Sequence, residues 1–98
     1  MPIECDPAKS ASNVRKHGLS FEMAAEFLAS GIDFVEIHDE EHSDDEDRFI
    51  AVGPIAGGVI VVVYTERDDD VLRIISARMA TKNERGHYEE YEKARRRR

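Results

Sequence analysis

The sequence contains one cysteine, three prolines and no tryptophan, and it has no long apolar run. The single cysteine, Cys5, cannot form an intrachain disulfide, which excludes the small disulfide-stabilised domains and leaves a structural thiol as the expected role. The longest apolar run, 59–63, is far shorter than the ~20 residues that span a bilayer, and the N-terminus has no apolar stretch of signal-peptide length. We therefore expect a cytoplasmic protein with no membrane-spanning segment.

The length predicts one domain over residues 1–98, because a chain of this size has room for a single core. The net charge is −7, but seven of the 21 acidic residues lie in one acidic loop, 39–47. The rest of the chain, which includes a basic tail at 95–98, holds 14 acidic and 14 basic residues and can still carry a basic patch. The total charge therefore excludes no nucleic-acid partner.

Segments rich in β-branched and aliphatic residues predict three consecutive antiparallel strands at 48–53, 59–65 and 71–77. A Pro/Gly cluster at 54–58 and a charged turn at 67–70 separate them. Two shorter segments, 34–38 and 3–5, are further strand candidates. Together they predict a small antiparallel sheet whose middle strand is apolar on both faces.

Two helices are predicted before these strands. Asp6 followed by Pro7 marks the start of a helix over 7–17, and Gly18 marks its end. Ser20 caps a second helix, which has one apolar face and ends before Gly31.

A last helix follows the strands, because Thr81 and Glu84 form a capping-box pattern and the helix can then run to about Lys93. Apart from Tyr88 and Tyr91 it has few apolar residues, so its burial should be thin. The predicted fold class is therefore α+β, with N-terminal helices and a C-terminal helix packed on a small antiparallel β-sheet. With so few helices we expect one sheet face to stay open as a partner surface.

His38 and His42 match the H-x-x-E-H arrangement of some zinc proteases. That motif needs both histidines one turn apart on a helix, whereas here a predicted strand leads into it and a run of carboxylates follows. A solvated acidic loop is the simpler interpretation, so we expect no metal site.

Cationic residues cluster at the ends of the predicted helices and strands: Lys16, His17, Arg48, Arg67, Arg73, Arg78 and Lys82. They form either a solvated rim paired with nearby carboxylates or part of a binding site, and spacing alone does not separate these alternatives. Arg73 is assigned to the rim, because it lies within a strand and strand parity predicts that it faces away from Arg78.

Glu66 and Arg67 lie together at the end of the strongest strand, where they are either turn residues or a base beside a phosphate ligand. His17 is equally ambiguous. It either complements the dipole at the end of the first helix or carries protons, as imidazole does near neutral pH.

Five segments in the same order, from Cys5 to about Tyr91, resemble the BrnT family of small bacterial toxins: CDPAKSASNVRKHGLSFEMAAEF, RFIAVG, VVVYTER, RIISAR and ATKNER. The resemblance implies an endoribonuclease toxin of a type II toxin–antitoxin pair, with a fold similar to the RelE group. It also implies RNA cleavage that needs no metal or cofactor.

Carried over residue by residue, the resemblance implies these site positions: Lys16, His17, Arg48, Glu66, Arg67 and Arg78. In metal-free RNA cleavage a base removes the 2′-OH proton, cations stabilise the phosphorane and an acid protonates the leaving 5′-oxygen. His17 or Glu66 is the expected proton carrier. The arginines are the expected phosphate ligands, and Lys16 and Lys82 are expected to bind RNA.

The order of the strands in the sequence suggests two subsites rather than one cluster. We expect Arg78 and Arg48 near one end of the sheet, with Lys16 and His17 beside them. Glu66 and Arg67 are expected near the other end.

The resemblance further implies a BrnA-like antitoxin, a ribbon-helix-helix DNA-binding protein, through which alone the toxin would contact operator DNA. The implied assembly is a homodimer or a 2:2 heterotetramer. Two alternatives stay open: a catalytically inactive partner-binding module of the same fold, and a metal-binding protein built on His38 and His42.

Overall fold

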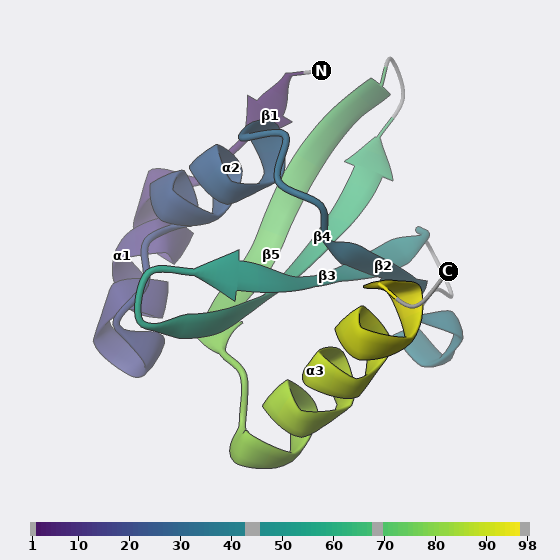
Figure 1. Cartoon of the computed structure of the whole chain (residues 1–98). Coiled ribbons are helices and arrows are strands. Elements are labelled where there is room, and N and C mark those ends of the chain that lie inside the picture. The colour runs from purple at the N-terminus through teal and green to yellow at the C-terminus, as the bar shows by residue number, and fades with distance from the viewer. Residues whose placement is uncertain (1, 43–45, 68–69, 97–98) are drawn as a thin grey trace.

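A computed structural model describes residues 2–42, 46–67 and 70–96, which form a five-stranded sheet with helices on both sides (Figure 1). The elements are β1 (Ile3–Glu4), α1 (Pro7–His17), α2 (Phe21–Ala29), β2 (Val35–His38), the 3-10 helix η1 (Glu40–His42), β3 (Arg48–Ile55), β4 (Gly58–Arg67), β5 (Val71–Met79) and α3 (Lys82–Arg96). The predicted α+β class is confirmed. Parts of the acidic loop 39–47, the turn 67–70 and the tail 95–98 lie outside the described residues.

The strands lie in the order β1-β5-β4-β3-β2, and the predicted meander β3–β4–β5 forms its centre. Arg48 opposes Thr65 and Ile55 opposes Gly58, so β3 extends through Pro54, which we had predicted to lie in the turn. β2 pairs with β3 only as far as Val52. Pro54, which has no N–H, therefore leaves no hydrogen bond to β2 unmade.

β1 is the exception to antiparallel pairing. It runs parallel to β5, with Ile3 opposite Leu72, and the N–H of Leu72 donates to the carbonyl of Pro2 at 3.0 Å. The prediction of an antiparallel sheet is wrong for this strand, and the sheet is mixed. A strand of two residues has too few side chains for the sequence to predict its partner strand or its direction, and β5 lies far away in the sequence.

The first helix begins and ends where its capping residues predict. The Asp6 carboxylate accepts from the N–H groups of Ala8 and Lys9, and Gly18, with φ 75°, donates its N–H to the carbonyl of Val14. Within α1 the buried amide of Asn13 donates to the carbonyls of Leu19 and Ala77, both at 2.7 Å. These bonds fix α1 to β5.

The second helix covers the same face of the sheet as α1. Ser20 caps it by accepting from the N–H of Met23 at 3.1 Å. Phe27 packs so tightly on β3 that a Cβ at Gly53 would lie 2.6 Å from its ring, so this packing requires glycine. The two helices and the sheet bury one core, whose main residues are Leu19, Phe21, Ala24, Phe27, Ala51, Ile60, Val62, Tyr64, Leu72, Ile74 and Ala77.

A β-bulge in β5 changes which side chains share a face. Val63 opposes Ser76, whereas the next residue of β4, Tyr64, opposes Ile74, so Ile75 is an extra residue in β5. Arg73 therefore opposes Thr65 while Arg78 opposes Val61, and both arginines lie on the face away from α1 and α2. The prediction that they lie on opposite faces is wrong, because simple strand parity does not hold across a bulge.

The third helix lies over this second face, which we call the open face. Thr81 and Glu84 form the predicted capping box, in which the Glu84 carboxylate accepts from the N–H of Thr81 at 2.8 Å. No residue of α3 among those described is buried, as the sparse apolar residues predict. The open face is thus partly covered by α3 rather than left bare.

Candidate functional site

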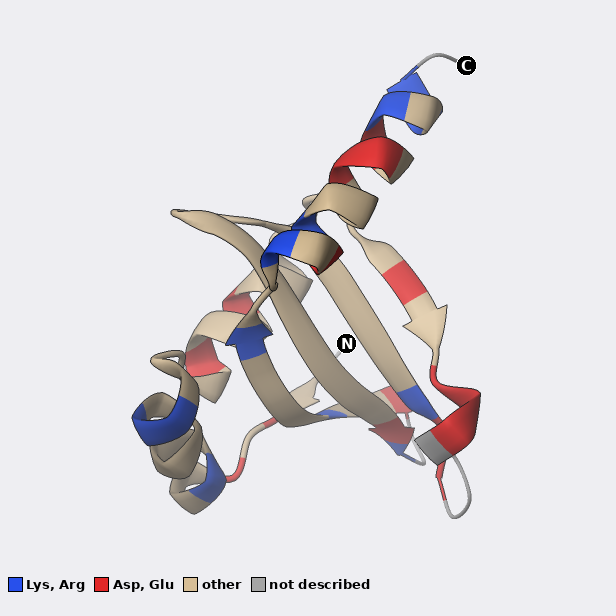
Figure 2. Cartoon of the chain, turned by 90° about the horizontal axis from the view of Figure 1, so that it is seen from below, with Lys and Arg blue, Asp and Glu red and all other residues tan. Residues whose placement is uncertain are grey.

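The open face and α3 enclose an apolar groove of about 380 Å³. Its floor consists of valine and isoleucine side chains from three strands: Val35, Ile37, Ile50, Val52, Val61 and Val63. The remaining lining consists of Arg78 and the α3 residues Glu84, His87, Tyr88 and Tyr91. In Figure 2, β3 and β4 are uncharged along most of their length and carry charged segments only toward one end.

Arg78 closes one end of the groove and is bound to α3. Its two terminal nitrogens donate to the Glu84 carboxylate at 2.6 and 2.8 Å. These bonds to Arg78, together with the N–H of Thr81, lower the pKa of Glu84 to about 2, and the same carboxylate raises the pKa of Arg78. A phosphate that binds Arg78 must therefore compete with Glu84.

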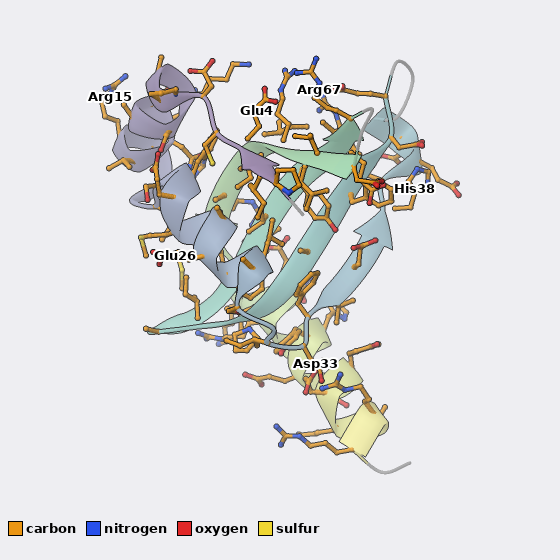
Figure 3. All side chains as sticks on the ribbon, turned by 90° about the horizontal axis from the view of Figure 1, so that it is seen from above. Glu4, Arg15, Glu26, Asp33, His38 and Arg67 are labelled. Carbon is orange, nitrogen blue, oxygen red and sulfur yellow. The ribbon has the colours of Figure 1, made fainter. Side chains whose placement is uncertain are left out.

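The opposite end of the open face carries a row of charged residues across neighbouring strands. Arg48 opposes Thr65, Thr65 opposes Arg73, and Arg73 opposes Glu4. Arg67 lies two residues beyond Thr65 on the same face, and its guanidinium is 3.3 Å from the Glu4 carboxylate (Figure 3). We call Arg48, Arg67 and Arg73 the arginine row.

The predicted grouping of Arg48 with Arg78 is wrong. Arg48 is level with Thr65 on β4 and Arg78 is level with Val61, which separates them by about 13 Å along the strands at the usual rise per residue. Strand order is the reason: β4 runs between them, and its register places the start of β3 beside the end of β4. Arg48 therefore belongs to the end that carries Arg67.

Lys16 and His17 lie at the end of α1, beside β5. Both line a small hollow with Ile75 and Ser76, and both are exposed. Because α1 packs on the helix-covered face, Lys16 and His17 lie at the edge of β5 beside Ile75 and Ser76 and do not line the groove of the open face. The predicted grouping of Lys16 and His17 with Arg78 stays a prediction, because the hollow that they line does not include Arg78.

Glu66 and Arg67 point to opposite faces, as neighbours on a regular strand do. Glu66 opposes Leu72, a residue of the helix-covered core, whereas Arg67 opposes Val71. Both are exposed at the end of β4. Lys82, the first residue of α3, is also exposed and lies in a shallow hollow with His87 and Glu90.

His38 and His42 do not share a helix. His38 ends β2, where its Nε2 is 3.2 Å from the Asp47 carboxylate and its ring packs on Phe49, while His42 belongs to η1. This arrangement differs from the one-helix geometry that an H-x-x-E-H zinc site requires. Among the described residues no group of three or more His, Cys, Asp or Glu side chains could hold a metal ion.

Cys5 lies beside the N-terminus of α2. Its thiol donates to the carbonyl of Phe21 at 3.7 Å, and burial, with the Glu22 carboxylate nearby, raises its pKa. A raised pKa reduces the thiolate fraction, so this thiol is a poor nucleophile.

The fold and its open face define an α+β protein in which a small mixed sheet carries an apolar groove and presents arginines at both ends of the open face. Residues 5–84 match the family of BrnT, the ribonuclease toxin of a type II toxin–antitoxin system, and the chain belongs to that family. As a member it is a ribonuclease toxin whose partner is an antitoxin.

A solved structure agrees with this assignment. The crystal structure of the Brucella abortus ribonuclease toxin BrnT is similar with a TM-score of 0.62 and 26% sequence identity, over 84% of this chain and 99% of that one. No curated protein matches the sequence. Within the described part of the chain, no helix has the length and apolar character to cross a membrane.

Sequence reasoning missed two residues that the structure adds to the open face. Arg73 was assigned to the solvated rim, because the bulge that turns it toward Arg48 has no local signature such as a glycine. His87 was not considered, since its position beside Arg78 depends on how α3 crosses the sheet. The RIISAR segment did contain Arg73, so the family resemblance was the available signal.

Proposed function

We propose that the open face is the RNA-cleaving surface and that cleavage proceeds by metal-independent acid–base chemistry. The observation that supports this most is the placement of arginines on one face of the sheet, within a chain whose family consists of ribonuclease toxins. Guanidinium groups bind phosphate oxygens through paired N–H donors and stabilise the charge that develops on the phosphorane.

His17 is the better proton carrier of the two candidates. It lies at the edge of β5 beside Ser76, whose partner Val63 lines the open face, whereas Glu66 projects from the helix-covered face at the far end of β4. An imidazole at this edge can remove the 2′-OH proton or protonate the leaving 5′-oxygen. In this proposal Arg48 and Arg67 hold the phosphate, and Lys16 and Lys82 bind flanking RNA. The acidic loop is proposed to contact a basic partner.

The antitoxin of this chain is proposed to be BrnA-like, a ribbon-helix-helix protein that carries the operator-binding function. A 2:2 complex is the assembly expected from the family, and the cytoplasm, where RNA and antitoxin meet, is the expected compartment.

The test is RNA cleavage by single alanine variants of the candidate residues: His17, Arg48, Glu66, Arg67 and Arg78. Each variant is first shown to be folded and to bind antitoxin. Loss of a phosphate ligand or the proton carrier costs about 2–4 kcal/mol of transition-state stabilisation, which is roughly 30- to 1000-fold in rate. We expect His17→Ala, Arg48→Ala and Arg67→Ala to show this loss and Glu66→Ala to show less.

Two controls complete the experiment. Arg15→Ala removes the same charge from the outer side of α1 and should leave cleavage unchanged. EDTA should also leave it unchanged, and activity that is lost with EDTA and restored by a divalent cation would contradict the metal-independent mechanism. Full activity in all five variants would reject the site.

A catalytically inactive partner-binding module is the second candidate, and the Arg78–Glu84 pair favours it, because it occupies an arginine that the active enzyme is expected to use. Wild-type chain that binds antitoxin but cleaves no RNA, with Glu84→Gln equally inactive, would establish this alternative.

A further inference from the structure

Arg73 shares its face and its level in the sheet with residues already proposed to bind phosphate. It is half-buried on β5 and opposes Thr65, which in turn opposes Arg48 on β3. With neighbouring strands about 4.8 Å apart, the Cα atoms of Arg48 and Arg73 are about 10 Å apart across β4. Both side chains stand on the same face, so their guanidinium groups can meet above Thr65.

Thr65 provides a rigid centre for this row. Its side chain is fully buried, with 0% exposure, and its hydroxyl donates to the carbonyl of Asp47 at 2.6 Å. That bond joins β4 to the residue just before Arg48. The two arginines therefore flank a fixed position rather than a mobile loop.

The arginine row gathers positive charge on one side of the sheet. Three arginines lie on one end of a single sheet face in a chain whose net charge is −7. Glu4 is the carboxylate that lies in the same row, opposite Arg73, and its ion pair with Arg67 at 3.3 Å is about half exposed. An exposed pair of this kind contributes little to stability, and a phosphate can replace the carboxylate.

We propose that Arg73 is an RNA-binding residue that completes a phosphate site with Arg48 and Arg67, and that Glu4 occupies this site when no RNA is bound. The inference rests on the proposed ribonuclease function and extends it to a residue that simple strand parity excludes. The ligand is a single-stranded RNA backbone, recognised through its phosphates and therefore without base preference.

The experiment measures binding rather than cleavage, with a 2′-O-methyl RNA oligonucleotide that lacks the attacking hydroxyl. Each phosphate contact on a single strand contributes about 0.7 to the slope of log K against log salt. Arg73→Ala should reduce the slope by about 0.7 and weaken binding about tenfold at low salt. Arg15→Ala, which removes the same charge from α1, should leave the slope unchanged.

Glu4→Gln tests the same site by a gain that a misfolded variant could not produce. Removing the competing carboxylate should strengthen binding about threefold, because electrostatic complementarity improves. The matched control is Glu26→Gln, which removes the same charge from the outer side of α2 (Figure 3) and should have little effect.

The outcomes separate this inference from the proposed function. If the wild-type chain cleaves no RNA but Arg73→Ala lowers the slope, the catalytic proposal fails and the RNA-binding site stands. If the chain cleaves RNA while Arg73→Ala and Glu4→Gln behave like their controls, the site is overturned and Arg73 belongs to the solvated rim.

Discussion

One buried side chain, Asn13, connects α1 to two distant parts of the backbone. Its amide nitrogen donates to the carbonyls of Leu19 and Ala77, and its oxygen accepts from the N–H of Ala77 at 3.4 Å. Asn13→Ala leaves these backbone groups buried without partners, which costs about 1–3 kcal/mol for each unsatisfied group. We expect the free energy of unfolding to fall by about 3 kcal/mol or more in a urea titration.

The matched control for this prediction is Asn83→Ala. Asn83 is exposed near the start of α3, so its loss should change stability by no more than about 0.5 kcal/mol. Equal effects at the two positions would show that the hydrogen bonds of Asn13 do not hold α1 on the sheet. Since His17 is one turn beyond Asn13, a displaced α1 would also move the proposed proton carrier.

The Arg78–Glu84 pair predicts a pH dependence of stability. The folded pKa of Glu84 is lowered from 4.5 to about 2, so the pair stabilises the fold above pH 4.5 and loses this contribution as the pH falls toward 2. Both side chains are more than a third exposed, which limits the contribution to about 1 kcal/mol. Urea titrations should therefore show Glu84→Gln less stable than the wild type at pH 7 but equal to it near pH 2.

A stability difference that stayed constant from pH 7 to pH 2 would contradict this assignment. The same variant also frees Arg78 for phosphate. If the open face cleaves RNA, Glu84→Gln should be at least as active as the wild type.

Among the three α-helices, α3 buries the least. It has no buried residue among those described, and it is attached mainly at its ends, by Glu84 to Arg78 and by Arg95 to Asp33 at 3.2 Å. It nevertheless shields an apolar floor on which Ile37 is still 50% exposed. A chain ended after Ala80 should stay folded but associate with itself through the uncovered groove.

Light scattering can check this prediction at a series of concentrations. A chain ended after Lys93 keeps Tyr88 and Tyr91 over the groove and should associate no more than the full chain. An unfolded product after truncation at Ala80 would show instead that α3 is part of the core.

Capping signals were readable from the sequence because they act over a few residues. Asp6, Pro7 and Gly18 predicted both ends of α1, and Thr81 with Glu84 predicted the start of α3. The pairing of β1 and the bulge at Ile75 were not readable, because each depends on a strand elsewhere in the chain.

For the candidate site, too, local sequence was informative and long-range pairing was not. The family resemblance pointed to Arg48, Arg67 and Arg78 as candidate site residues, but which of them lie close together depended on strand order and register. Those are properties of the whole sheet, so Arg48 was assigned to the wrong end and Arg73 to the rim.

At the scale of the whole molecule, the open face is also the expected antitoxin surface. Hydrogen exchange of the toxin with and without antitoxin should show added protection in β2 and α3, the two elements that border the groove. The amides of β4 are already paired on both sides and should change little. Protection confined to the acidic loop 39–47 would contradict this placement.

The parallel pair of β1 and β5 has a consequence for the order of folding. The meander closes through nearby residues, whereas Ile3 must find Leu72 across most of the chain, and such distant pairing is slow. In pulsed hydrogen exchange during refolding, the amide of Leu72, which donates to Pro2, should become protected after the amides of β4. During synthesis β1 leaves the ribosome first and stays unpaired until β5, the last strand, has been made. Glu4 and Arg73 then come together only when the chain is nearly complete, so an interrupted nascent chain carries no finished toxin surface.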